Sequence, residues 1–197
     1  MLHKLLKNKK LVLASGSPRR QELLNMLGLD FAIMIPDIDE SMLDTDHRNP
    51  RGYITRIASE KCRAIICKTD PDSLVIAADT IVYFQKEIYI KPGNQQEAEI
   101  ILTRLSGQTH IVYTAIAIGY QNKLITEIAK TSVKFSDLSK EEILQYIATT
   151  EPMDKAGGYG IQGYGAQIVE KINGCYFNVM GFPINMFYEM IKSLLLK

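Results

Sequence analysis

Short apolar runs alternate with segments of helical periodicity along the chain. This alternation predicts an α/β fold with a mixed, twisted sheet flanked by helices. Because no repeat or clear linker interrupts it, residues 1–197 are expected to form a single domain, with two lobes sharing one core. The predicted strands are 11–15, 31–35, 73–84, 110–120 and 123–135. The predicted helices are one from Pro18, 50–68, 93–107, one after Ser139, and 183–196.

Local signals place several of the boundaries. Asn94 with Glu97, and Ser139 with Glu142, have the spacing of a capping box, in which two residues cap each other at a helix start. Asn173-Gly174 separates two apolar segments, AQIVEKI and CYFNV. Asn-Gly is a strong signal for a two-residue turn, so we expect a β-hairpin there.

Composition and charge argue against several classes of protein to which this chain could belong. The chain is 46% hydrophobic and 23% charged, with a formal net charge of +1, so no overall basic field attracts nucleic acid or an acidic membrane. The three cysteines lack the paired spacing of a zinc site and are interpreted as free buried thiols. The basic N-terminus has neither a long apolar region nor a cleavage site, and no apolar run approaches the ~20 residues of a membrane span. We therefore expect a cytoplasmic protein.

The helix expected at Pro18 carries two arginines in its first turn. Ser17 suits its N-cap, and Arg19 and Arg20 follow. Cations there oppose the helix dipole by about 0.3–1 kcal/mol each at exposed sites. A bound phosphate would make the arrangement favourable, because the free N–H groups of a first turn and guanidinium forks both suit that anion. Ser15 adds a further hydroxyl. The alternative is a pair of solvated arginines.

Two charged residues interrupt apolar patterns at a cost in stability. On a helix over residues 53–67, Lys61 falls in the middle of an isoleucine-rich stripe. Its ammonium either reaches the helix edge or enters a site that holds an anion. Asp79 interrupts the strand LVIAADTIVYF, where a carboxylate needs a metal, a cation or a catalytic task. The alternative for Asp79 is a strand-end cap.

Acidic and glycine-rich segments supply weaker candidates. Residues 37–40, Asp-Ile-Asp-Glu, offer oxygen ligands for Mg²⁺, although most acidic loops are simply solvated. Residues 152–163 are rich in glycine, which permits close backbone approach to a ligand but also suits a flexible or turn-rich connection. The segment lacks both the phosphate-loop and the dinucleotide fingerprints.

Taken in order, five short motifs resemble the Maf family of nucleoside triphosphate pyrophosphatases. They are ASGSPRR at 14–20, ADT at 78–80, KP at 91–92, LSG at 105–107 and DKAG at 154–157. The resemblance runs from about Leu11 to the last helix. It implies an α/β fold like that of the inosine triphosphatases, with a cleft between two lobes, often as a homodimer. It also implies hydrolysis of a nucleoside triphosphate to the monophosphate and pyrophosphate with a divalent metal, Mg²⁺ or Mn²⁺.

The resemblance assigns roles residue by residue. The catalytic proton acceptor of the family matches Asp79, its metal-associated glutamate matches Glu40, and its two motif lysines match Lys61 and Lys91. The form of the motifs is similar to that of the branch that acts on dTTP and UTP. The substrate-selecting positions of the family match Arg19, Thr80 and Gln162. One departure is Ile90, where the family usually has glycine before Lys-Pro.

The implied chemistry uses each costly residue. Glu40 and Asp79 would hold or orient the metal and its waters, and Asp79 would take a proton from water attacking the α-phosphorus. The charge of the triphosphate would be neutralised by the basic side chains of Arg19, Arg20, Lys61 and Lys91. Its oxygens would be held by the hydroxyls of Ser15 and Ser17 together with the start of the helix.

Two other functions stay open at the level of sequence. The first is a non-catalytic nucleotide-binding regulator of cell division, which would bind nucleotide without turnover. The second is a nucleic-acid-binding module that uses the arginine turn and the basic N-terminus. The near-neutral charge and the absence of an aromatic-basic face argue against the second.

Overall fold

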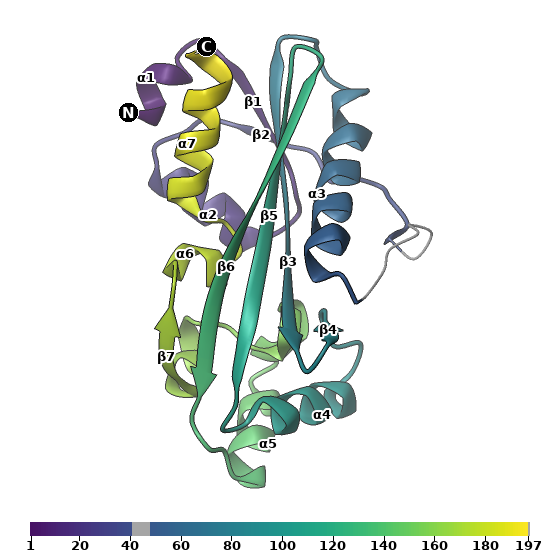
Figure 1. Ribbon diagram of the computed structural model, residues 1–197, viewed down its shortest axis with the longest axis vertical. Coiled ribbons are helices and arrows are strands. Elements are labelled where there is room, and N and C mark those ends of the chain that lie inside the picture. The colour runs from purple at the N-terminus through teal and green to yellow at the C-terminus, as the bar shows by residue number, and fades with distance from the viewer. Residues whose placement is uncertain (41–47, 197) are drawn as a thin grey trace.

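The protein is a mixed α/β structure organised around one long, twisted sheet (Figure 1). The computed structural model describes residues 1–40 and 48–196. Within these ranges the strands are β1 (Lys10–Ala14), β2 (Ala32–Ile33), β3 (Ser73–Phe84), β4 (Glu87–Tyr89), β5 (Thr109–Tyr120), β6 (Lys123–Phe135) and β7 (Val169–Asn173). The α-helices are α1 (Leu2–Leu5), α2 (Pro18–Met26), α3 (Pro50–Ile66), α4 (Gln95–Leu105), α5 (Lys140–Ala148), α6 (Tyr176–Val179) and α7 (Ile184–Leu195). The short 3₁₀ helices that lie wholly within these ranges are η2 (Glu151–Asp154), η3 (Ala156–Gly158) and η4 (Gly163–Gln167).

The sheet combines a parallel and an antiparallel part. Its described strands follow the order β2-β1-β3-β5-β6-β7, with β4 also paired to β3. The pairs β2–β1 and β1–β3 are parallel, and the other pairs are antiparallel. β5 and β6 join through Gln121 and Asn122, both with positive φ, as a tight two-residue hairpin requires. The predicted mixed, twisted sheet is confirmed.

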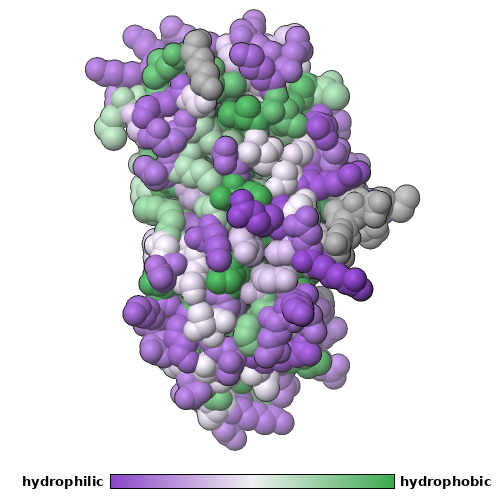
Figure 2. All heavy atoms as spheres, in the orientation of Figure 1, coloured by the Kyte–Doolittle hydropathy of each residue, from purple (hydrophilic) through white to green (hydrophobic). Residues whose placement is uncertain are grey.

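Helices cover different regions of the three long strands. α3 packs on one face through an isoleucine-rich stripe, while α1, α2 and α7 gather on the opposite side at the same end (Figure 1). α4 and α5 cover the other end, where a third apolar cluster lies. The chain is therefore built as two lobes on shared strands; that it forms a single domain stays a prediction. The face in Figure 2 is mainly hydrophilic, with separate hydrophobic patches between polar ones.

Three local predictions need correction. Residues 175–179 do not form the second strand of a hairpin: β7 ends at Asn173, and α6 follows after Gly174. The second predicted strand, 31–35, is reduced to the two residues of β2. The Asn94 side chain accepts from the Glu97 N–H, but the Glu97 carboxylate accepts from Gly93, so that capping box is only half formed. The box at Ser139 and Glu142 is complete.

The cysteines are free, as expected, but only one is buried. Cys62 lies on the buried face of α3, Cys175 is half-buried and Cys67 is exposed. Burial raises the pKa of the Cys62 thiol to about 12, so this cysteine stays protonated near neutral pH. No helix among the described residues has the length and apolar character needed to cross a bilayer.

Candidate active site

A gap in the pairing of β3 opens a cleft between the lobes. β3 pairs with β1 along Ser73–Ala77 and with β4 from Val82 to Phe84. Between these stretches, residues 78–81 have no partner on this edge among the described strands. Successive side chains of a strand point to opposite faces, so Asp79 and Thr80 reach the gap from the two sides of the sheet.

All ten site residues predicted from the sequence line one cavity of about 870 Å³ at this gap. They come from the loop after β1, from α2 and α3, from the segment after β2, from β3, from the segment after β4 and from the glycine-rich segment 152–163. The ten are Ser15, Ser17, Arg19, Arg20, Glu40, Lys61, Asp79, Thr80, Lys91 and Gln162. A second cavity of about 460 Å³, between α3 and β6, is lined by none of them.

The Lys61 side chain extends from the apolar stripe of α3 and places its ammonium group inside the cleft. Its Nζ lies 2.6 Å from Asp79 Oδ1 and 2.8 Å from Glu40 Oε1. The Lys61 and Asp79 side chains are 16% and 17% exposed, against 42% for Glu40. One ammonium is therefore shared by two carboxylates in a partly desolvated setting, where charges interact more strongly than in bulk water. Of the two interpretations of Lys61, the structure supports a place in a site.

Arg20 is buried and held by neutral acceptors. Its Nε donates to the carbonyl of Gly181 at 3.0 Å, one terminal nitrogen donates to Ser15 Oγ at 3.0 Å, and the other donates to Thr80 Oγ1 at 3.2 Å. Burial lowers the pKa of the Arg20 guanidinium, while the charge of Asp79 acts in the opposite direction. Arg20 thus fixes three segments of the cavity wall and leaves a positive charge at its base.

The serines of the first loop are not equivalent. Ser15 Oγ accepts from Arg20 and, at 3.2 Å, from the Ser17 N–H, so it braces the loop. Ser17 occupies the N-cap of α2 as predicted, but its side chain forms no capping hydrogen bond. The Ser17 hydroxyl is therefore the more available of the two for a ligand.

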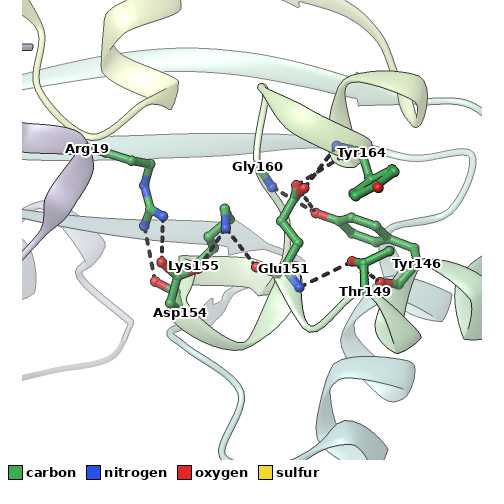
Figure 3. A network of polar contacts seen from close by, with 9 residues as sticks. Arg19, Tyr146, Thr149, Glu151, Asp154, Lys155, Gly160 and Tyr164 are labelled. Carbon is green, nitrogen blue, oxygen red and sulfur yellow. Dashed lines mark hydrogen bonds and ion pairs between the residues drawn. The ribbon is translucent and has the colours of Figure 1, made fainter. Parts of the chain in front are cut away.

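Arg19 connects α2 to the glycine-rich segment across the cleft (Figure 3). It donates to Asp154 Oδ2 at 2.8 Å and to the Asp154 carbonyl at 3.1 Å. Lys155 donates to Asp154 Oδ1 and to the Glu151 carbonyl, both at 2.7 Å. Burial raises the pKa of Asp154, but hydrogen bonds and charge from Lys155 and Arg19 lower it more, and the net shift is downward. Asp154 and Lys155 belong to a motif quoted above, but the sequence assigned them no role.

A carboxylate organises the rest of the glycine-rich segment. Glu151 accepts from the Tyr146 hydroxyl at 2.9 Å and from the N–H groups of Tyr164 and Gly165 at 2.9 and 3.1 Å (Figure 3). The Tyr146 hydroxyl accepts in turn from the Gly160 N–H at 3.1 Å. Gln162 lies between these fixed points and lines the cavity. These hydrogen bonds tie the backbone at Gly160, Tyr164 and Gly165 to Tyr146 and Glu151.

Lys91 and Ile90 form the opposite rim. Lys91 is exposed and forms no side-chain hydrogen bond or ion pair with another described residue. The Ile90 carbonyl accepts from the Gly157 N–H at 3.0 Å, which ties β4 to the glycine-rich segment. Ile90 is not among the described residues with positive φ, so this backbone does not require glycine.

The charges of the cavity wall balance. In the described part of the chain, five basic and five acidic side chains line it. The basic ones are Arg19, Arg20, Lys61, Lys91 and Lys155, and the acidic ones are Glu22, Glu40, Asp79, Glu151 and Asp154. The wall therefore does not neutralise a polyphosphate by an excess of cations. No group of three or more His, Cys, Asp or Glu side chains within residues 1–40 and 48–196 is arranged to hold a metal by itself.

Comparisons with known proteins identify the family and the fold of the chain. Residues 10–194 match the model of the family described as Maf-like protein. The chain is 42% identical over 185 residues to a dTTP/UTP pyrophosphatase of Bacillus cereus, covering 94% of this chain and 90% of that protein. It is 44% identical over 185 residues to a dTTP/UTP pyrophosphatase of Photorhabdus laumondii, covering 94% of each. The solved structure of the Staphylococcus aureus Ham1 protein has the same fold, with a TM-score of 0.52, 14% identity and coverage of 94% of this chain and 99% of that one.

Proposed function

Because the chain belongs to the family of Maf-like proteins, we propose that it is a nucleoside triphosphate pyrophosphatase that hydrolyses dTTP and UTP. The products are the nucleoside monophosphate and pyrophosphate. The observation that carries this proposal is the meeting of Lys61, Asp79 and Glu40 in the same cavity as the arginine turn of α2. Relatives more than 40% identical over most of the chain bear that activity in their names.

The polyphosphate lies, in this proposal, between the start of α2 and Lys91. Backbone N–H groups of the first turn and the Ser17 hydroxyl donate to phosphate oxygens. Arg19 and Lys91 contribute charge from the two rims. Arg20 adds a fixed positive charge below them without a change of conformation, because its three anchoring hydrogen bonds are already formed.

Asp79 acts as the general base. It accepts a proton from a water molecule that attacks the α-phosphorus, and pyrophosphate leaves. Lys61 holds the carboxylates of Asp79 and Glu40 toward one point and offsets part of their charge. The contribution of these residues is positioning and electrostatic stabilisation, which dominate phosphoryl-transfer catalysis.

A divalent cation, Mg²⁺ or Mn²⁺, fits the donor set. Mg²⁺ is commonly bound through one or two carboxylates together with substrate phosphates and waters, and Glu40 and Asp79 supply such a pair. The balanced charge of the wall favours a substrate that arrives with a cation. When bound, the ion lowers the pKa of a coordinated water and neutralises charge on the phosphates.

Selection of the base is proposed to fall to Arg19, Thr80 and Gln162, which line one cavity although they are far apart in the sequence. Homodimerisation and a cytoplasmic location complete the proposal and rest on the family resemblance and composition.

A panel of nucleotides tests the function. Purified protein is incubated with dTTP, UTP, CTP, ATP and GTP in the presence of Mg²⁺ or Mn²⁺, and pyrophosphate and inorganic phosphate are assayed separately. We expect pyrophosphate from dTTP and UTP and little inorganic phosphate. Binding of dTTP without pyrophosphate release would support the regulatory alternative instead. Tight, steeply salt-dependent binding of DNA or RNA without turnover would support the nucleic-acid alternative.

A further inference from the structure

We propose that Thr114, buried behind the cavity, fixes the Thr80 hydroxyl as a hydrogen-bond acceptor and thereby selects uracil and thymine over cytosine. Thr114 is a positioning residue in this proposal, since it acts on the substrate through Thr80. The inference rests on the proposed function, which places a pyrimidine nucleotide in this cavity. It goes further by naming the residue and the direction of the hydrogen bond that distinguish the bases.

The direction follows from counting protons along a chain of hydroxyls. Thr114 Oγ1 lies 2.9 Å from the carbonyl oxygen of Asn178, which can only accept, so the single proton of Thr114 is used there. Thr80 Oγ1 lies 3.0 Å from Thr114 Oγ1, so in this pair Thr80 must be the donor. Arg20, which can only donate, supplies a hydrogen bond to Thr80 at 3.2 Å. The Thr80 hydroxyl has no proton left and retains only an acceptor lone pair.

The last acceptor in this series of hydrogen bonds, the Asn178 carbonyl, is held in place by its surroundings. Thr114 and Asn178 are fully buried. The Asn178 side-chain nitrogen donates to the Val112 carbonyl at 3.1 Å and to Thr131 Oγ1 at 2.9 Å. The Asn178 carbonyl also accepts from the Gly181 N–H at 3.0 Å. If Thr114 instead donated its proton to Thr80, its hydrogen bond to the Asn178 carbonyl would be lost. That loss is equivalent to about five- to tenfold in an equilibrium constant.

The Thr80 side chain is packed between Thr114 and Gly181, which keeps its hydroxyl beside that of Thr114. It is directly opposite Thr114 in the pairing of β3 with β5. On its other side is Gly181, where an added Cβ would lie only 3.1 Å from Thr80 Oγ1. Gly181 has a φ of +100°, which favours glycine and lets this backbone pack against the hydroxyl.

An acceptor at Thr80 has a definite preference among pyrimidines. On the pairing edge of uracil or thymine both oxygens accept, and the N3–H is the only donor. An acceptor-only hydroxyl can therefore bind this edge only at N3. Cytosine presents an unprotonated nitrogen at the same position, so two lone pairs would face each other. Its one donor on this edge is the N4 amino group, where uracil and thymine carry an oxygen, so cytosine would have to shift in the site to reach Thr80. A site built for one hydrogen-bonding pattern discriminates against a base that leaves its polar group unpaired.

Substitution of Thr114 separates this role from a structural one. Thr114→Val keeps the shape of the side chain but removes the acceptor for the Thr80 proton, so Thr80 becomes free to donate to cytosine. We expect the ratio of kcat/KM for UTP to that for CTP to fall about five- to tenfold, chiefly because CTP improves. Thr114→Ser, which restores the hydroxyl, should return the ratio toward wild type. An unchanged ratio in a folded Thr114→Val protein would overturn the inference.

Thr131→Val is the matched control. Thr131 is equally buried and forms hydrogen bonds with Asn178 and Cys175, but it is not a hydrogen-bond partner of Thr80, whose partners are Arg20 and Thr114. General loosening around α6 should affect both valine variants, whereas only Thr114→Val should change the UTP/CTP ratio. A similar change in Thr131→Val would show that the effect is structural and would count against the proposal.

Wild-type protein offers a second measurement that does not depend on a variant folding. N3-methyl-UTP lacks the N3–H, and 5-methyl-UTP keeps it. We expect the first to lose at least about tenfold in binding and turnover relative to the second; equal values would overturn the inference. Binding is measured separately from hydrolysis. Preferential binding of UTP and 5-methyl-UTP without turnover would contradict the proposed function while supporting the inference. Turnover without discrimination would do the reverse.

Discussion

Asp79→Asn is expected to lower kcat for pyrophosphate release from dTTP by at least about 100-fold, the contribution typical of a general base. The amide has nearly the shape of the carboxylate but cannot accept a proton from water. Lys61 retains Glu40 as a partner in this variant, so the cavity should stay intact and nucleotide affinity should change only a few-fold. Steady-state kinetics and a separate binding titration measure the two effects.

Glu22→Gln is the control for charge. Glu22 also lines the cavity, but it is exposed and takes no part in the ion pairs of Lys61 with Asp79 and Glu40. The Glu22→Gln substitution changes the formal charge of the cavity wall by the same amount as Asp79→Asn. Because an exposed charge is screened by solvent and salt, we expect kcat within about threefold of the wild-type value. Wild-type turnover in Asp79→Asn, or equal losses in both variants, would exclude Asp79 as the base.

Lys61→Met is expected to lower kcat/KM for dTTP by about 100- to 1,000-fold, a loss as large as that from removing one fixed electrostatic contact in an active site. Methionine keeps an unbranched apolar side chain within the stripe of α3, but it lacks the ammonium that joins Asp79 and Glu40. The two carboxylates then repel each other and lose their common orientation. Kinetics over a range of Mg²⁺ concentrations measure the loss and show whether added cation offsets it.

Arg63→Met is the matched control on the same helix. Arg63 is 59% exposed in its side chain and pairs with Glu60 at 2.6 Å, outside the candidate site. Exposed ion pairs contribute little, so this variant should keep wild-type kinetics. Full activity in Lys61→Met would show that the shared ammonium has no catalytic importance.

The sequence predicts the site residues better than the contacts that hold them. Arg19, Lys61 and Asp79 were identifiable because each is placed against a local rule, namely the helix dipole or an apolar periodicity. Their partners are not local: Arg19 meets Asp154, 135 residues later in the chain. Neither the hydrophobic periodicity of a single sequence nor its short motifs can indicate a contact between residues so far apart. The balance of charges on the cavity wall likewise becomes visible only in the folded structure.

The failed hairpin has a similar cause. Asn173-Gly174 is a strong turn signal, and Gly174 does adopt a positive φ of 134°. The next residues nevertheless form α6, which places the Asn178 side chain against Val112 and Thr131 on two central strands. The two hydrogen bonds that the buried side-chain nitrogen of Asn178 donates to these strands favour the helical turn over the local preference of CYFNV for a strand. The polar chain through Thr114 and Thr80 depends on the same tertiary placement.

Isotope labelling examines the attack on the α-phosphorus most directly. Hydrolysis of dTTP is run in water enriched in the heavy oxygen isotope, and both products are analysed by mass spectrometry. Attack at the α-phosphorus predicts one heavy oxygen in dTMP and none in pyrophosphate. Label in the pyrophosphate would mean attack at the β-phosphorus, and release of inorganic phosphate with dTDP would mean attack at the γ-phosphorus; either result would contradict the placement of Asp79 and its water beside the α-phosphorus.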